Sequence, residues 1–237
     1  MSKRIKFFLS HLMISALLAL LVIWLVFFIW YSAPLADALG VKHLFLMLIV
    51  VDIIIGPLLG FFVYKEHKKS LKFDLIVVIC IQLSAFAYGF YAIAKGRPAW
   101  VVYDALAFHL VKSSDIEQSH IALAQPQFQN TGWLKPQVVN LDTSLLKNNP
   151  LPQGTVVVNH PMYYSDFTSA KSKIQNVAFP LFLLEKYNDK KEISTILQKY
   201  PNADAWLGLS APVKDMVVLI NKEKGEVIKI VDLRPWK

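Results

Sequence analysis

The chain has 237 residues, of which 55% are hydrophobic, and its mean hydropathy is positive, so it is too apolar for an ordinary soluble domain. The formal net charge of +8 does not indicate nucleic-acid binding, because it is shared between two halves. Residues 1–94 hold 8 Lys/Arg against 4 Asp/Glu, and residues 95–237 hold 17 against 13 with both signs mixed, as on an ordinary solvated surface.

Three apolar runs predict membrane-spanning helices at about residues 7–31, 44–64 and 75–94. Each is about 20 residues long, enough to cross a bilayer core of roughly 30 Å. A cleaved signal peptide is the alternative for the first run, because residues 1–4 are basic and residues 36–38 are small around an Asp. That run is much longer than the roughly 7–15 apolar residues of a signal peptide. We therefore expect it to remain as a span.

The basic residues near these runs predict the orientation in the membrane. Lys3, Arg4 and Lys6 precede the first run, and the loop at residues 65–72 carries four more Lys. Short cytoplasmic segments are enriched in Lys and Arg, so the N-terminus and this loop are expected in the cytoplasm. Three crossings then leave residues 96–237 in the periplasm of a bacterial inner membrane. The only cysteine, Cys80, lies in the third run, so no intrachain disulfide is possible.

The second run contains a carboxylate, which is costly in a bilayer and therefore indicates a functional or helix-pairing role. Asp52 is followed by Gly56 and Gly60 at spacings that place all three on one helix face. The two glycines form a notch of the kind that lets helix backbones approach closely. Pro57 is expected to free a backbone carbonyl near Asp52.

The third run offers Gln82 and Gly89 on one face, and two interpretations stay open. In the first, the bundle packs internally: Gln82 hydrogen-bonds Asp52 and the small residues seat the second helix. In the second, the face is left open for a partner helix. Asp52 is expected to pair with Gln82 or another polar group, or to be protonated.

Residues 96–237 are predicted to form one small α+β domain, so the fold class is a three-helix transmembrane bundle followed by an extracytoplasmic α+β domain. A capping-box pattern from Ser114 to Glu117 predicts the start of a short helix. The other elements expected are strands at residues 100–111 and 155–159, a helix at residues 189–200 and a hairpin of residues 213–221 and 226–233.

No pattern in the chain indicates catalysis. The six histidines have no metal-ligand spacing, and no nucleophile elbow, phosphate loop or dinucleotide fingerprint is present. His160, Ser165 and Asp166 are close in sequence, which is better explained by a polar turn than by a triad. We expect no catalytic residue, no metal, no cofactor and no small-molecule substrate.

Several motifs resemble the type IV pilin accessory proteins of the TfpX/TfpZ kind. The motifs that carry the resemblance are Asp52-Ile-Ile-Ile-Gly-Pro-Leu58, Asp74, Gln82-Leu83, Tyr88-Gly89, Arg97-Pro98 and Arg234-Pro-Trp236. One segment departs from the family pattern, because relatives often carry Asp-Arg-Phe where this chain has Leu106-Ala-Phe108.

The resemblance implies a non-enzymatic membrane accessory protein, or chaperone, that stabilises a cognate type IV pilin and promotes its assembly into pili. The expected partners are that pilin and the lipid bilayer. The residues expected to bind the pilin are Asp52, Gly56, Pro57, Gly60, Gln82, Gly89 and Arg97. The alternative is a membrane-bound enzyme that modifies the pilin or an envelope lipid. It would require clustered acidic or histidine residues at the outer membrane surface, and Asp37, Asp104 and Asp115 form no recognisable set.

Overall fold

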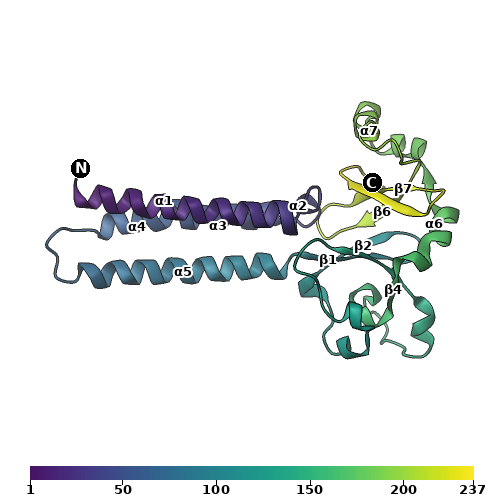
Figure 1. The fold of residues 1–237 in the computed structure, drawn as a ribbon, viewed down its shortest axis with the longest axis horizontal. Helices are drawn as coiled ribbons and strands as arrows, with labels where there is room; N and C mark the ends of the chain where they lie inside the picture. The colour runs from purple at the N-terminus through teal and green to yellow at the C-terminus, as the bar shows by residue number, and fades with distance from the viewer. The chain divides into compact units, whose positions relative to one another are not determined.

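The computed structural model describes residues 1–237, which fall into two units. The first unit comprises Met1–Ser32 and Val41–Gly96, and the second comprises Ala33–Gly40 and Arg97–Lys237. The first is a bundle of three long apolar helices, and the second is a sheet with helices packed on it (Figure 1). We call the second the outer unit, after the orientation that the sequence predicts. The predicted architecture, a three-helix bundle followed by an α+β domain, is therefore confirmed.

Each of the three helices of the first unit is long and apolar enough to cross a membrane. Two of them contain a π-helical segment, in which the backbone hydrogen bonds span five residues instead of four. The first helix consists of α1 (Lys3–Trp24) and η1 (Leu25–Trp30), the second of α3 (Val41–Ile49), η2 (Val50–Ile55) and α4 (Gly56–Val63), and the third is α5 (Leu71–Lys95).

The second helix lies in the middle of the bundle. The first helix and α5 each pack against it along their length, whereas they make few contacts with each other. Near one end of the bundle, Arg4 Nε donates to the carbonyl of Phe61 at 2.7 Å. Near the other end, the Tyr31 hydroxyl donates to the carbonyl of Ile93 at 2.7 Å. These two bonds join the first helix to both of its neighbours.

The outer unit is built on one eight-stranded sheet of order β4-β3-β1-β2-β6-β7-β8, with the short β5 also paired to β6. The pairs β1–β3 and β2–β6 are parallel, and the others are antiparallel. The strands are β1 (Pro98–Tyr103), β2 (Phe108–Lys112), β3 (Gln137–Leu141), β4 (Tyr164–Asp166), β5 (Phe179–Pro180), β6 (Ala205–Ser210), β7 (Met216–Asn221) and β8 (Glu226–Val231).

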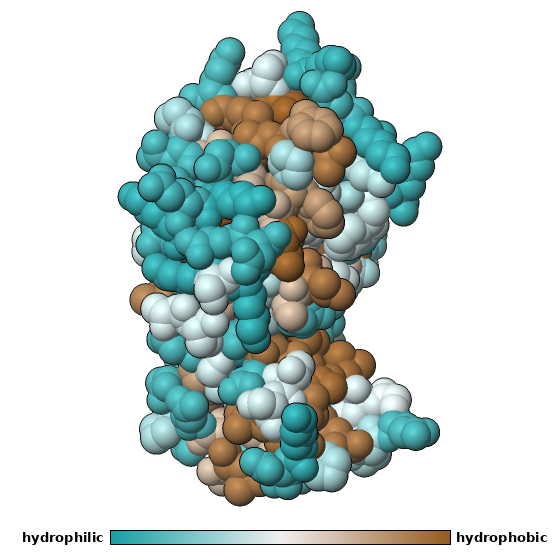
Figure 2. All heavy atoms as spheres, turned by 90° about the vertical axis from the view of Figure 1, so that its right-hand side faces the viewer, coloured by the Kyte–Doolittle hydropathy of each residue, from teal (hydrophilic) through white to brown (hydrophobic).

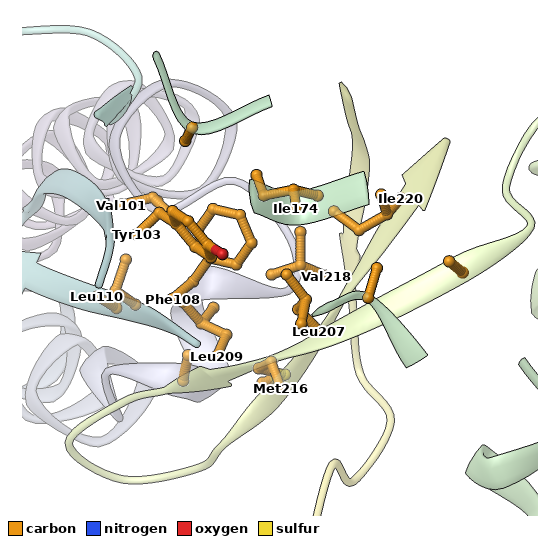
Figure 3. Packing of buried hydrophobic residues seen from close by; sticks show 14 of the residues in the cluster. Val101, Tyr103, Phe108, Leu110, Ile174, Leu207, Leu209, Met216, Val218 and Ile220 are labelled. Carbon is orange, nitrogen blue, oxygen red and sulfur yellow. The ribbon is translucent and has the colours of Figure 1, made fainter. Parts of the chain in front are cut away.

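Both faces of this sheet are buried, because alternate side chains of a strand point to opposite faces. One face forms the main core, in which Val101, Tyr103 and Leu207 meet Ile174 of α6 (Lys171–Val177) (Figure 3). Leu35 and Ala38 of α2 (Leu35–Ala38) belong to the same cluster. The short segment between the first two membrane helices is therefore part of the outer unit's core.

The opposite face of the sheet is covered in two places. Trp100 and Val102 of β1 pack under short 3-10 turns together with Tyr164. Val217 and Leu219 of β7 pack with Ile193 of α7 (Lys190–Leu197). Because both faces of the sheet are buried, the side chains on either side of β1, β6 and β7 are apolar. These strands therefore appear in the sequence as nearly continuous apolar runs.

Two of the elements expected in this unit are confirmed. Asp189 caps α7 by accepting hydrogen bonds from the backbone N–H of Lys191 and Glu192, at 2.8 and 3.3 Å. The hairpin forms from β7 and β8 around the turn that contains Gly225.

Three other expectations are wrong in detail. Residues 100–111 form not one strand but two, β1 and β2, which pair as a hairpin. Ser114 starts no helix; the Glu117 carboxylate accepts from the backbone N–H of Ser119 instead, at 2.9 Å. Residues 155–159 contain a 3-10 turn rather than a strand.

The turn between β1 and β2 is held by one carboxylate. Asp104 Oδ1 accepts from the backbone N–H of Leu106 and Ala107, at 3.2 and 3.0 Å, and Oδ2 lies 2.7 Å from His109 Nε2. Burial raises the pKa of the Asp104 carboxyl, but the hydrogen bonds from His109 and from the backbone lower it by more. The pKa of Asp104 therefore lies below its usual range.

We expect this carboxylate to make the stability of the outer unit pH-dependent. A group whose pKa is lowered by folding stabilises the protein above its unfolded pKa, and the stabilisation is lost as pH falls through the folded pKa. Asp104→Asn keeps an acceptor for the backbone but loses the charge, so it should cost about 1 kcal/mol at pH 7 and flatten the acid side of the stability profile. Denaturant unfolding of the detergent-solubilised chain, followed by tryptophan fluorescence, measures both effects.

Asp115→Asn provides the control, because the Asp115 carboxylate makes only exposed contacts: a hydrogen bond from Ser114 Oγ at 2.9 Å and an ion pair with Lys112 at 3.4 Å. Such pairs contribute little to stability. An Asp104→Asn protein with the parent's stability and pH profile would contradict the role given to this carboxylate.

Candidate functional site

The glycines of the predicted notch lie at contacts inside the bundle. A Cβ added at Gly56 would overlap the side-chain amide of Gln82 on α5. A Cβ at Gly60 would lie 3.0 Å from the Phe7 ring on α1, and one at Gly89 would lie 2.8 Å from Leu48 Cδ1 on α3. The internal-packing interpretation thus describes how all three glycines are used in this structure.

Gln82 supplies a hydrogen bond that the second helix cannot make for itself. In the π-helical segment the N–H of Gly56 donates to the carbonyl of Val51, and Pro57 has no N–H to give. The carbonyl of Asp52 is left without a helical donor, and Gln82 Nε2 donates to it at 2.9 Å. The expectation that Pro57 frees a carbonyl near Asp52 is confirmed.

The Asp52 side chain is the second feature of this region. It is only 6% exposed, and neither carboxylate oxygen has a hydrogen-bond partner. Gln82 therefore does pair with Asp52, but through the backbone carbonyl of Asp52 and not through its carboxylate. Gln82 Nε2 also lies 3.4 Å from Ser15 Oγ, which links α5 to α1.

A hollow of about 240 Å³ opens beside Asp52, between α1 and α5. The backbones of these two helices approach each other at few points, so the second helix forms the floor of this hollow. We call this hollow the trough; its lining consists of His11, Ile14, Ser15, Leu18, Asp52, Ile79, Gln82, Leu83 and Phe86. Its walls are apolar and its polar groups belong to four residues, of which one is a carboxylic acid and none is Lys or Arg.

Arg97, the remaining residue expected to bind a partner, lies at the start of β1 and is 5% exposed. Its Nη2 donates to Thr131 Oγ1 at 3.1 Å, and its guanidinium stands 4.5 Å from the ring centre of Trp133. Arg97 thereby holds a loop whose Trp133 and Leu134 side chains are exposed. Arg97 belongs to the outer unit, whereas the other six residues expected to bind the pilin belong to the bundle of membrane helices.

The outer unit carries an apolar hollow of about 300 Å³ that the sequence did not reveal. Leu106, Phe179 and Trp206 line it together with Trp236, whose ring lies over Gly208 of β6. Figure 2 shows hydrophobic surface running down one face of this unit between hydrophilic side chains. The exposed Leu106 belongs to the segment that departs from the family pattern, so this chain has an apolar group at the edge of the hollow.

Comparison with known proteins identifies the relatives of this chain. A family model for the fimbrial assembly protein FimB matches residues 1–40. The chain is 30% identical over 200 residues to the fimbrial assembly protein of serogroup E1 of Dichelobacter nodosus. The aligned residues make up 80% of this chain and 78% of that protein. The chain belongs to the fimbrial assembly protein family.

Two further fimbrial assembly proteins of Dichelobacter nodosus support this assignment. The protein of serogroup I is 29% identical over 200 residues, with the same 80% and 78% coverage. The protein of serogroups C1 and C2 is 36% identical over 108 residues, which are 45% of this chain and 82% of that protein. The predicted relationship to type IV pilus accessory proteins is confirmed. No solved structure matches the chain.

The segment matched by the fimbrial assembly protein model contains parts of both units. Residues 1–40 comprise the first membrane helix, whose His11, Ser15 and Leu18 line the trough, and α2. The segment therefore contributes one wall of the trough and two side chains of the outer core.

His160, Ser165 and Asp166, which are close in sequence, make separate contacts in the structure. Asp166 accepts from the backbone N–H of Thr168 at 2.8 Å, as a turn cap, and Ser165 Oγ contacts Asn140 and Ser169. His160 packs edge-on against Tyr163. No group of three or more His, Cys, Asp or Glu side chains is arranged to hold a metal ion.

Proposed function

We propose that this chain is a bacterial inner-membrane accessory protein that stabilises a cognate type IV pilin and promotes its assembly into pili. One observation carries the proposal: the chain aligns over 80% of its length with proteins named for fimbrial assembly. The alignment is too long to be confined to the membrane helices, so the relationship extends into the outer unit.

The two units suit the two parts of such a partner. The family resemblance implies a pilin that waits for assembly with an apolar helix in the bilayer and a globular head outside it. Three apolar helices offer contacts to the former, and the outer unit offers contacts to the latter. A protein that binds only the folded, membrane-held pilin stabilises it by mass action and protects it from proteolysis.

This proposal requires the outer unit to lie in the periplasm, and the basic residues next to the spans support that orientation. A reporter that is active only in the periplasm should therefore be active when it is fused after Lys237. The same reporter inserted at Lys68, between α4 and α5, should be inactive. The reverse pattern would contradict the orientation.

The function is tested by deleting the gene and measuring the pilin. We expect the amount of the cognate pilin and the number of surface pili to fall while the pilin transcript stays constant. Expression of the intact chain from a second locus should restore both. Unchanged pilin and pili in the deletion strain would refute the proposed function.

A further inference from the structure

The trough between α1 and α5 is closed at one end and open along its side. At the closed end, the rings of Trp30 and Phe90 stand 5.5 Å apart, and the Tyr31 hydroxyl bonds to α5. From that contact toward the N-terminal ends of α1 and α5, the backbones of the two helices approach each other at few points. Only 6% of the most apolar stretch of α5 is buried. An apolar face of α5 therefore remains available for another helix in the bilayer.

The lining of the trough contains buried polar atoms that the bundle leaves without a hydrogen-bond partner. Both oxygens of Asp52 and the Oε1 of Gln82 are buried without a hydrogen-bond partner, and so is Nδ1 of His11. A polar group without a partner is expensive in hydrocarbon, where no water can replace the missing bond. Lipid tails carry no donors, so lipid in the trough would leave this cost in place.

We infer that the trough is a binding site for a single transmembrane helix that carries a hydrogen-bond-donating group, preferably a cationic one. The two helices and the floor form three sides of a four-helix arrangement, and the apolar walls contributed by Ile14 and Leu83 match an apolar occupant. The carboxylate of Asp52 favours a positive donor, because no Lys or Arg lines the trough. Both carboxylate oxygens are buried in the unbound chain, so binding requires the Asp52 side chain to turn toward this donor.

The inference rests on the proposed function, because we assign the occupant to the membrane helix of the pilin. It also moves the binding face away from Gly56 and Gly60, which contact the chain's own helices. The partner instead lies in the trough, against the exposed sides of α1 and α5.

Site-specific photocrosslinking in cells tests the inference with the full chain and its pilin. A photoactivatable phenylalanine analogue is placed at Ile14 or Leu83 in the trough. The controls are Met13 on α1 and Ile81 on α5, which are equally exposed but lie outside the trough lining: 61% and 62%, against 62% and 55% for Ile14 and Leu83. We expect crosslinks to the apolar segment of the pilin from the two trough positions and not from the controls.

The outcomes separate this inference from the proposed function. Crosslinks to lipid only, to a second copy of this chain, or to the pilin equally from all four positions would overturn the trough assignment, even where deletion of the gene lowers pilin levels. If deletion leaves pilin levels unchanged, the proposed function fails first.

A second arm tests the role of the carboxylate. With the analogue at Leu83, Asp52→Leu should lower the crosslink to the pilin about three- to tenfold, which is the effect of one interhelical hydrogen bond in a bilayer. Asp52→Asn, which still accepts a hydrogen bond, should retain most of the crosslink. Equal yields from the parent, Asp52→Asn and Asp52→Leu proteins would overturn the assignment of Asp52 as the acceptor.

Discussion

Exchange of the outer unit for that of a relative dedicated to another pilin is expected to exchange pilin preference, by about tenfold or more in relative affinity. Specificity is a difference of affinities, and it resides where the competing ligands differ. The membrane helices of pilins are expected to be alike, so they supply affinity without discrimination. Under the proposed function, the outer unit is the part of the chain that reaches the variable heads.

The structure defines how this exchange must be made. Leu35 and Ala38 are buried in the core of the outer unit, so residues 33–40 have to be exchanged together with residues 97–237. A chimera that exchanges only residues 97–237 combines a foreign core with the native α2 and is the control for misfolding. Co-purification of each chimera with both pilins is the measurement. A preference that follows the three membrane helices would contradict this division of labour.

Gly56→Ala is expected to damage the membrane bundle more than any other single-methyl change at its glycines. The added methyl group displaces the amide of Gln82, which then loses its hydrogen bond to the carbonyl of Asp52. An unsatisfied buried carbonyl costs about 1–3 kcal/mol. Thermal unfolding of the purified chain in detergent and the pilin level in cells should both show the loss.

Gly60→Ala is the matched control, because its methyl group meets the outer edge of the Phe7 ring at 3.0 Å and breaks no hydrogen bond. A side chain near the end of α1 can move by a few tenths of an ångström, so the effect should be small. Equal stability of the Gly56→Ala and parent proteins would refute the role given to Gln82.

The membrane unit was largely predictable from sequence, because hydropathy and length alone specify a spanning helix. The role of Pro57 was also predictable, since a missing N–H always leaves a carbonyl to satisfy. The sequence could not predict that Gln82 donates to the backbone carbonyl of Asp52, because the i→i+5 hydrogen bonds around Asp52 have no sequence signature.

The outer unit was less predictable. The β1–β2 turn contains no Gly or Asn; it depends on the Asp104 side chain and on Ala105 at φ 82°, a region that Ala rarely adopts. Nothing in the short segment of α2 indicates that it belongs to a core formed by strands far along the chain. By contrast, the Asp189 cap and the apolar periodicity are local signals, and they located α7 correctly.

In the candidate site, too, local features were predictable and contacts between distant segments were not. Sequence spacing placed Asp52, Gly56 and Gly60 on one helix face, but it could not show which neighbouring helix covers that face. The trough depends on the separation of α1 and α5, which only the packing of all three helices determines.

The most direct test of the account is the lifetime of the pilin before assembly. In a strain that cannot polymerise pili, newly made pilin is pulse-labelled and followed with and without this chain. The account predicts that the pilin half-life shortens when the chain is absent and returns to the parent value when the intact chain is restored. A half-life that is the same in both strains would contradict the claim that this chain stabilises its pilin.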